Sequence, residues 1–431
     1  MNTLIKNIKF WLPPSQIRYI YFTISISEFA TGLATPLLTF LFFSTDSSLF
    51  PRDLSMAQRG VIFGLFIGIY RLAGLFSNPV FGFLSDLFGR KKIILIAIVG
   101  IFIFGICSIL ALIFHSVWVF AIGACIFSFL WSLRPVSAAA INDVTDNRHK
   151  IKNLAFMQFF IGIGAGLGPI LGGYLGLFKP MGYHYMLPFI LVVIFSVFLF
   201  IYTNCSFKET LSASNRFTSP KELFLPSNIQ TLFSNKTLYF LMLINILDQF
   251  SWGAYYNFMP PITKIVFNYG ISSVGLFIGL IGIWLIVSTG VLIPFLQRYF
   301  NNTQLIIVSS LIGTVGVIIN YAATFFPDQI LAHYLIWICA FPIAAGDVIL
   351  FCLLVSLFSS YVSKQYQGTI VGIVYIVGMA MWCLAAPIGG YLMKWRHNGA
   401  MVLCPIAMIS LLIFLAFSLK KEWFKSLNKM N

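Results

Sequence analysis

Twelve long apolar runs constrain this chain more than any other feature of its sequence. A helix needs about 20 apolar residues to cross a hydrocarbon core about 30 Å thick. The runs cover 20–43, 60–81, 93–114, 117–141, 153–177, 187–203, 237–258, 273–296, 304–326, 331–357, 368–392 and 401–419. They are too long for the strands of a membrane barrel and lack the alternation of those strands. The sequence therefore predicts an all-α integral membrane protein with 12 transmembrane helices.

The composition agrees with this fold class and excludes several others. Only 9% of the residues are charged and 59% are hydrophobic, whereas about a quarter of a soluble domain is charged. A soluble enzyme, a disordered chain and a disulfide-stapled secreted domain are therefore excluded. The seven cysteines form no Cys-x-x-Cys pair and the five histidines are scattered, so we expect no metal site and no cofactor. No nucleophile–base or phosphate-loop pattern predicts an enzyme.

The longest polar stretch, 204–236, separates two sets of six runs. The resulting halves, 1–203 and 237–431, repeat two features. The sequence Gly-Pro-Ile-Leu-Gly-Gly-Tyr-Leu at 168–175 returns as Ala-Pro-Ile-Gly-Gly-Tyr-Leu at 386–392. The first span of each half carries a carboxylate, Glu28 and Asp248. Because repeated halves around a midplane site are a common transporter plan, we predict two pseudo-symmetric six-helix bundles joined by a linker.

The basic residues predict the orientation of the chain in the membrane. Lys and Arg show a roughly threefold excess on one side of the membrane if both termini lie in the cytoplasm, as the positive-inside rule requires. The formal net charge of +15 is therefore a topology signal rather than evidence for nucleic-acid binding. We expect a multi-pass protein of the cytoplasmic membrane that contacts the lipid bilayer and works as a monomer.

Two motifs resemble those of a known family. Residues 82–92, Gly-Phe-Leu-Ser-Asp-Leu-Phe-Gly-Arg-Lys-Lys, closely resemble the signature loop of the major facilitator superfamily. The run Gly164, Gly168, Pro169, Gly172 and Gly173 in span 5 resembles the antiporter motif of its drug/proton branch.

The first and fourth spans are similar to the tetracycline-efflux group of that branch. In the first span the similar residues are Glu28, Gly32 and Pro36, and in the fourth they are 140–146. Relatives place an arginine early in span 4, where this chain has Ala124 and carries Arg134 further along. The resemblance implies the fold of the superfamily and a 12-span drug/proton antiporter.

The signature segment is expected to form a tight turn between spans 2 and 3. Gly82 and Gly89 lower the steric cost of such a turn. Asp86 can accept hydrogen bonds at a helix N-terminus, where the dipole favours an anion. The resemblance implies that this helix is span 11 and that Arg90 joins the same cluster. The contact would then form in one transport state and break in the other, as a conformational latch.

The glycines of span 5 predict a close helix–helix contact. Gly164, Gly168 and Gly172 recur at intervals of four and share one helical face, so another helix can approach closely. Pro169 removes one backbone hydrogen bond and bends the helix. The face is either a sliding seam between the two halves or a site of static packing.

Five ionisable groups lie deep in the predicted spans: Glu28, Arg71, Arg134, Asp248 and Asp347. Each costs about 2.5–3.5 kcal/mol near the bilayer centre, so these groups must pair with one another or line a wet cavity.

Three roles for these groups compete. Glu28 or Asp248 can bind a proton or a cationic substrate, whereas Arg71 and Arg134 suit an anionic substrate. Internal pairing, for instance of Arg71 with Glu28, is the structural alternative. The residues around Asp248 are either a ligand wall or ordinary packing: Gln249, Trp252, Tyr255, Tyr256 and Asn257.

Together these features predict a secondary active transporter with a small organic solute and protons as its partners. We expect alternating access with proton-coupled efflux. The alternative is a proton-linked importer of an anionic metabolite, such as an amino acid, a carboxylate or a polycarboxylate siderophore.

Overall fold

The computed structural model describes residues 15–45, 47, 49–51, 53–145, 149–211, 236–361 and 367–420, and this part of the chain is helical. The first half contains α2 (Ser15–Phe43), α3 (Met56–Phe88), α4 (Arg90–Ile113), α5 (Val117–Leu130), α6 (Leu133–Asp143), α7 (Lys150–Leu175) and α8 (Met186–Ser206). The second half contains α10 (Lys236–Ile265), α11 (Ile271–Val287), α12 (Ile293–Leu296), α13 (Asn302–Ala323), α14 (Ile330–Ser360), α15 (Gln367–Leu392) and α16 (Leu403–Lys420). Most of the predicted linker, 204–236, and both termini lie outside the described residues.

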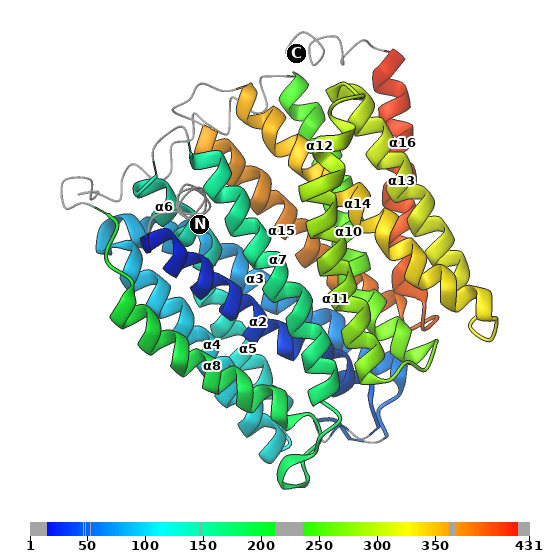
Figure 1. The fold of residues 1–431 in the computed structure, drawn as a ribbon. Helices are drawn as coiled ribbons and strands as arrows, with labels where there is room; N and C mark the ends of the chain where they lie inside the picture. Colours follow the sequence, from blue (N-terminus) through cyan, green and yellow to red (C-terminus); the bar gives the residue numbers. More distant parts are fainter. Residues whose placement is uncertain are drawn as a thin grey trace, which may run out of the picture.

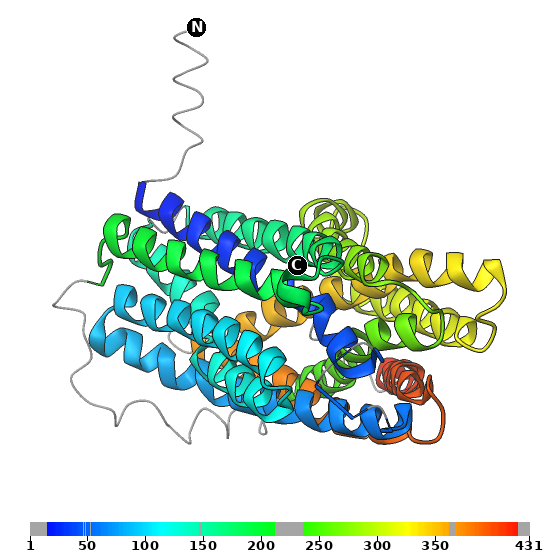
Figure 2. The ribbon, with the colours of Figure 1, turned by 90° about the horizontal axis from the view of Figure 1, so that it is seen from below.

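The two halves form two helical bundles that lie side by side (Figures 1 and 2). Their internal packing is the same. The first helix of each half packs on the fifth span, α2 on α7 and α10 on α15, and the third span packs on the sixth, α4 on α8 and α13 on α16. Between the halves, α3 packs on α15 and α7 packs on α11. The internal duplication predicted from the sequence is therefore present in the packing.

Eleven segments of the described chain are long and apolar enough to cross a membrane, and α10 is the predicted span that falls short. The reason is its composition: α10 carries Asn245, Asp248, Gln249 and Asn257. These four side chains are nevertheless buried. The helix that fails the hydropathy test is therefore the one that carries the most polar groups into the protein interior.

Span 4 is broken into α5 and α6 at Trp131 and Ser132. Pro135 explains the position of the break. A proline has no N–H to donate to the carbonyl four residues earlier, and its ring clashes with that carbonyl; here the carbonyl belongs to Trp131. The break places Arg134 in the first turn of α6, where its side chain leaves the helix toward α2.

The predicted loop between spans 2 and 3 is almost entirely helical. The helix α3 continues to Phe88, and Gly89 is the single residue before α4 begins at Arg90. Gly89 has φ +101°, a conformation in which a Cβ would be strained. The prediction of a turn at Gly82 is wrong, because Gly82 lies inside α3 and a Cβ there would meet nothing within 4 Å.

Among the described residues, the closest glycine contacts between α3 and α15 lie toward one end of the molecule. We call the end where α3 meets α4, with Arg90, the basic face, and the opposite end the far face. On the far-face side of α3, a Cβ at Gly64 would lie 2.7 Å from the Cα of Gly390 on α15. Toward the basic face, a Cβ at Gly290 or Gly372 would meet nothing within 4 Å. The bundles are thus closed together at the far face.

Candidate functional site

An ion pair joins α2 to α6 in the first half. Arg134 donates from Nε to Glu28 Oε1 at 2.6 Å and from a terminal nitrogen to Glu28 Oε2 at 2.8 Å. The Glu28 side chain is 6% exposed, whereas that of Arg134 is 51% exposed. Tyr256 and Tyr375 of the second half lie within electrostatic range of Arg134. The pair is therefore bidentate, and its arginine faces the second half.

The pairing of Arg71 with Glu28, considered from the sequence, does not occur. Arg71 on α3 lies against aromatic rings instead, 4.7 Å from the ring centroid of Trp382 and 5.4 Å from that of Tyr70. Its Nε is buried without a hydrogen-bond partner. Among the described residues, no carboxylate lies within ion-pair distance of Arg71. Arg71 is thus a cation held by π faces across the contact between the halves.

Two acids meet in the second half. Gln249 donates from Nε2 to Asp248 Oδ2 at 3.1 Å and to Asp347 Oδ1 at 2.9 Å. The amide oxygen of Gln249 accepts a hydrogen bond from Trp382 Nε1 at 3.2 Å. Asp248 is 2% exposed. One amide therefore holds two carboxyl groups together, that of Asp248 buried and that of Asp347 partly buried.

The predicted ligand wall around Asp248 divides into two sets. Trp252 meets Trp382 edge to face and Tyr256 meets it at a tilt, at centroid distances of 6.4 and 5.5 Å, so they belong to the cluster that contacts Arg71. Tyr255 is completely buried in the core of the second half and Asn257 is nearly so. The Tyr255 hydroxyl and the Asn257 amide nitrogen have no hydrogen-bond partner.

The charges occupy corresponding positions in the two halves. Glu28 lies on the first span of its half and contacts Arg134 on the fourth. Asp248 lies on the first span of its half and shares Gln249 with Asp347 on the fourth. The first and fourth spans thus bring together an acid and a base in the first half and two acids in the second half.

The charged cluster at the basic face is internal to the first half. Arg90 contacts Asp86 at 2.6 Å and Asp143 at 3.0 Å. The acid at a helix N-terminus is Glu209, whose oxygens accept from the backbone N–H groups of Arg90 at 2.9 Å and Lys91 at 3.2 Å. Residues 362–366, before α15, lie outside the described residues, so the contact of Asp86 with span 11 stays a prediction.

The span 5 glycines form two faces with different partners. Gly164, Gly168 and Gly172 face α2 within the same half; a Cβ at Gly168 would lie 2.5 Å from the carbonyl oxygen of Phe29. These three do not form a seam between the halves. That seam is formed by neighbouring positions, such as Gly173, where an added Cβ would lie 3.0 Å from the Cα of Gly275 on α11. The carbonyl of Pro169 faces the same helix.

Three residues that the sequence did not single out make specific contacts, two of them with the groups described above. Trp382 connects Arg71 to Gln249, and Glu209 caps α4. Arg59 is 2% exposed and donates to the backbone carbonyls of Phe42, Ser44, Pro51 and Leu54. Arg59 is therefore a structural cation that fastens the loop before α3. A Ser55–Gln58 capping box, the one local signal, marks the start of that helix.

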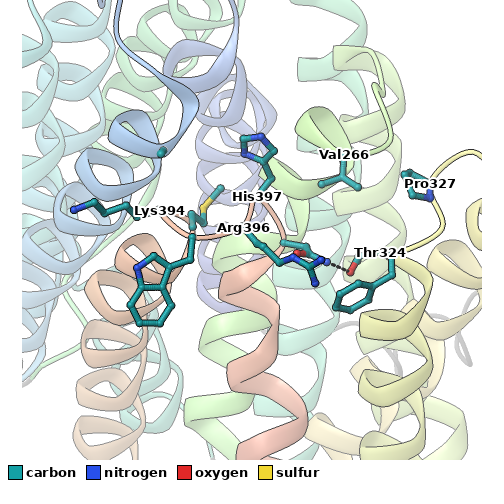
Figure 3. A pocket seen from close by; sticks show the side chains of 11 residues that line it. Val266, Thr324, Pro327, Lys394, Arg396 and His397 are labelled. Atoms are coloured by element: carbon teal, nitrogen blue, oxygen red, sulfur yellow. Dashed lines mark hydrogen bonds between the residues drawn. The ribbon is translucent and has the colours of Figure 1, made fainter.

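A cavity of about 420 Å³ lies at the far face, away from the five interior charges. It lies where the α15–α16 connection meets the loop between α13 and α14, and Ala57 is its contribution from the first half. Lys394 and Arg396 point to different sides, and Asn398 donates to Thr324 at 2.9 Å (Figure 3). The basic side chains that line this cavity therefore do not converge on one point.

Comparison with known proteins decides the family. The sequence profile of the Major Facilitator Superfamily matches residues 20–386. The chain belongs to this superfamily. It is 26% identical over 261 residues to the class H tetracycline resistance protein of Pasteurella multocida, a match of 60% of this chain and 62% of the relative. It is 27% identical over 161 residues to the quinolone resistance protein NorA of Staphylococcus aureus, 37% of this chain and 38% of NorA.

The first of these matches spans about three fifths of the relative's length and the second less than half. Among solved structures, the human organic anion transporter MFSD10 superposes with a TM-score of 0.67 at 17% identity and covers 94% of this chain and 100% of its own. That identity is low enough for the likeness to concern the fold alone. Membership of this superfamily makes the chain a multi-pass membrane protein of a transporter family rather than of an enzyme family.

Proposed function

We propose that this transporter exports a small organic solute in exchange for protons. The observation that carries the proposal is the paired arrangement of interior charges: Glu28 bound to Arg134 in one half, and Asp248 beside Asp347 in the other. Both sites combine burial with ionisable groups, so each can exchange a proton as access alternates. The resistance proteins among the relatives support export and a drug-like organic solute.

The packing between the halves suggests how access alternates. The halves are closed at the far face, where α3 meets α15 and α7 meets α11. The opposite state would close at the basic face, where Arg90 holds Asp86 and Asp143. We infer that the basic face is cytoplasmic, because it carries the excess of Lys and Arg. The described state then faces inward.

Transport in proteoliposomes with an imposed pH gradient tests the proposal, with tetracycline and norfloxacin as probes. Glu28→Gln, Asp248→Asn and Asp347→Asn each remove one ionisable group at nearly constant shape. We expect at least one to abolish gradient-driven transport while exchange without a gradient persists. Asp328→Asn is the matched control, because Asp328 is exposed on a far-face turn. Unchanged gradient-driven transport in all three variants would refute proton coupling at these acids.

Arg71 favours a second candidate function, import of an anionic metabolite. Its guanidinium lies between π faces, and among the described residues no acid neutralises it. A bidentate carboxylate or phosphate group matches such a cation. Arg71→Gln should then stop uptake of organic acids but spare ethidium, a lipophilic cation. Arg298→Gln, at an exposed position of the basic face, is the control. The reverse pattern would exclude this candidate.

A further inference from the structure

A continuous chain of contacts joins the acid pair of the second half to the first half. Gln249 uses its amide nitrogen for both carboxyl groups, at 3.1 and 2.9 Å. Its amide oxygen accepts from the indole N–H of Trp382 at 3.2 Å. The Trp382 ring then carries the guanidinium of Arg71, 4.7 Å from its centroid. Each polar atom of one amide is therefore used, and the chain ends on the opposite half.

We propose that Gln249 and Trp382 are positioning residues that couple protonation of Asp248 and Asp347 to the contact between the halves at Arg71. The inference rests on the proposed function, because it assumes that the acid pair binds a proton during transport. It assigns a role to the amide and the indole, neither of which carries charge. The structure places both between the charged groups that they connect.

The hydrogen-bonding capacity of the groups explains the coupling when both acids are ionised. A carboxylate is an acceptor only, and an amide nitrogen has two N–H donors. Two ionised carboxylates can therefore each take one N–H of Gln249, and their repulsion is offset by that shared donor. This fixes the amide with its oxygen toward Trp382. The indole N–H then has a single acceptor, which holds the ring in the plane that faces Arg71.

Adding one proton changes this arrangement. The proton comes from water and stays on an oxygen of Asp248 or Asp347, which becomes an O–H donor to the other carboxylate. The second carboxylate then no longer needs an N–H of Gln249, and the amide is free to rotate. Rotation withdraws the acceptor from Trp382, so the ring loses its fixed orientation over Arg71. Protonation in the second half thus loosens a contact between the halves.

The other ionisable groups near the pair are few and can be controlled. Cys352 on α14 lies within electrostatic range of Asp347, and Tyr375 on α15 lies near Cys352. On the first half, the facing cations are Arg71 and Arg134. Further titratable groups on the surrounding helices include Tyr255 and Tyr256 of α10, Cys339 of α14, Cys383 of α15, Cys404 of α16 and Glu28 of α2. The helices α11 and α13 contain no aspartate, glutamate, lysine, arginine or histidine.

A distance measurement between the halves tests the inference without any substrate. Spin labels are placed at Phe88 and Tyr299, which are 48% and 68% exposed near the basic face. Attachment through unnatural amino acids leaves the native cysteines in place. In lipid nanodiscs, we expect the wild-type distance distribution to shift between mildly alkaline and mildly acidic pH. Loss of one hydrogen bond corresponds to a change in the population ratio of about fivefold.

Trp382→Phe is the decisive variant, because it keeps an aromatic face for Arg71 and removes the N–H that binds Gln249. We expect it to lose the pH shift, and Gln249→Leu to do the same. Trp284→Phe is the matched control: Trp284 lies on α11 against Phe341 and should keep the shift. Asp347→Asn should show the acidic-pH distribution at both pH values. An unchanged shift in Trp382→Phe, or an equal loss in Trp284→Phe, would overturn the inference.

The measurement separates this inference from the proposed function. If the pH shift depends on Trp382 but the liposomes show no proton-driven transport, the coupling exists and the proposed exchange is wrong. If proton-driven transport requires Asp248 or Asp347 but Trp382→Phe keeps the shift, the exchange stands and this coupling route is wrong. In liposomes, Trp382→Phe should also flatten the pH dependence of transport more than it raises KM.

Discussion

Removing Arg134 should destabilise the protein more than neutralising its partner Glu28. The two side chains form a bidentate ion pair, but their surroundings differ: Glu28 is 6% exposed and Arg134 is 51% exposed. Loss of Arg134 leaves a carboxylate in the interior with no cation beside it. Neutralisation of Glu28 leaves a guanidinium that still reaches solvent. Removing Arg134 and neutralising Glu28 break the same ion pair, but they lower the stability of the protein by different amounts.

The magnitudes follow from that difference in exposure. Breaking a fully buried pair by removing one partner costs about 3–5 kcal/mol. Because Arg134 is half exposed, solvent screens the interaction, and we expect about 2–3 kcal/mol for Arg134→Ala. Glu28→Gln retains the shape and hydrogen-bonding capacity of the side chain, so we expect a loss of about 1 kcal/mol.

Thermal unfolding in detergent measures both variants. A thiol-reactive dye suits the assay, because Cys339 and Cys404 are buried and become reactive on unfolding. The unfolding temperature of Arg134→Ala should rise as the pH falls, since Glu28 can then bind a proton and remain buried as a neutral acid. That of Glu28→Gln should lack this recovery. Equal losses in the two variants, or no recovery of Arg134→Ala at low pH, would refute the reasoning.

Three further substitutions test the packing. Gly168→Ala should lower the unfolding temperature, because a Cβ there would lie 2.5 Å from the carbonyl oxygen of Phe29. Gly82→Ala should instead stabilise α3 by about 0.5–1 kcal/mol, since a Cβ there would meet nothing within 4 Å and alanine favours a helix. A lower unfolding temperature of Gly82→Ala would contradict this reasoning. Gly89→Ala should lower the free energy of unfolding by about 1–2 kcal/mol, because φ at this position is +101° and the new Cβ would meet Glu209. Thermal unfolding in detergent measures this loss as well. An unchanged unfolding temperature would show that the junction between α3 and α4 relaxes without cost.

The sequence predicted the elements well because membrane helices obey a local rule. Run length and hydropathy locate each span without knowledge of its neighbours, and the repeat of Glu28 by Asp248 indicated two related halves. The break at Trp131 was also encoded locally, by Pro135, although span 4 was predicted as one helix. The sequence did not predict that the signature segment is helical. Gly82 suggested a turn, whereas the turn is at Gly89.

The partners of the buried charges could not be predicted in the same way. Glu28 and Arg134 are 106 residues apart, and no pattern within either helix shows which one it will face. The five charges gave several possible pairs, and the structure selects Arg134 for Glu28 and leaves Arg71 with Trp382. A tryptophan in an apolar helix carries no local mark of a role. Helix adjacency is a tertiary property, and it decides these contacts.

The unequal pairing in the two halves sets an electrical balance for the interior. With all five groups ionised, two positive charges oppose three negative ones, so the interior holds one excess negative charge. A low-dielectric environment penalises net charge of either sign. One bound cation, whether a hydron or a singly charged organic ion, makes the interior neutral, and a second would reverse the imbalance. A proton and a singly charged organic cation should therefore compete for the interior, which binds one of them at a time.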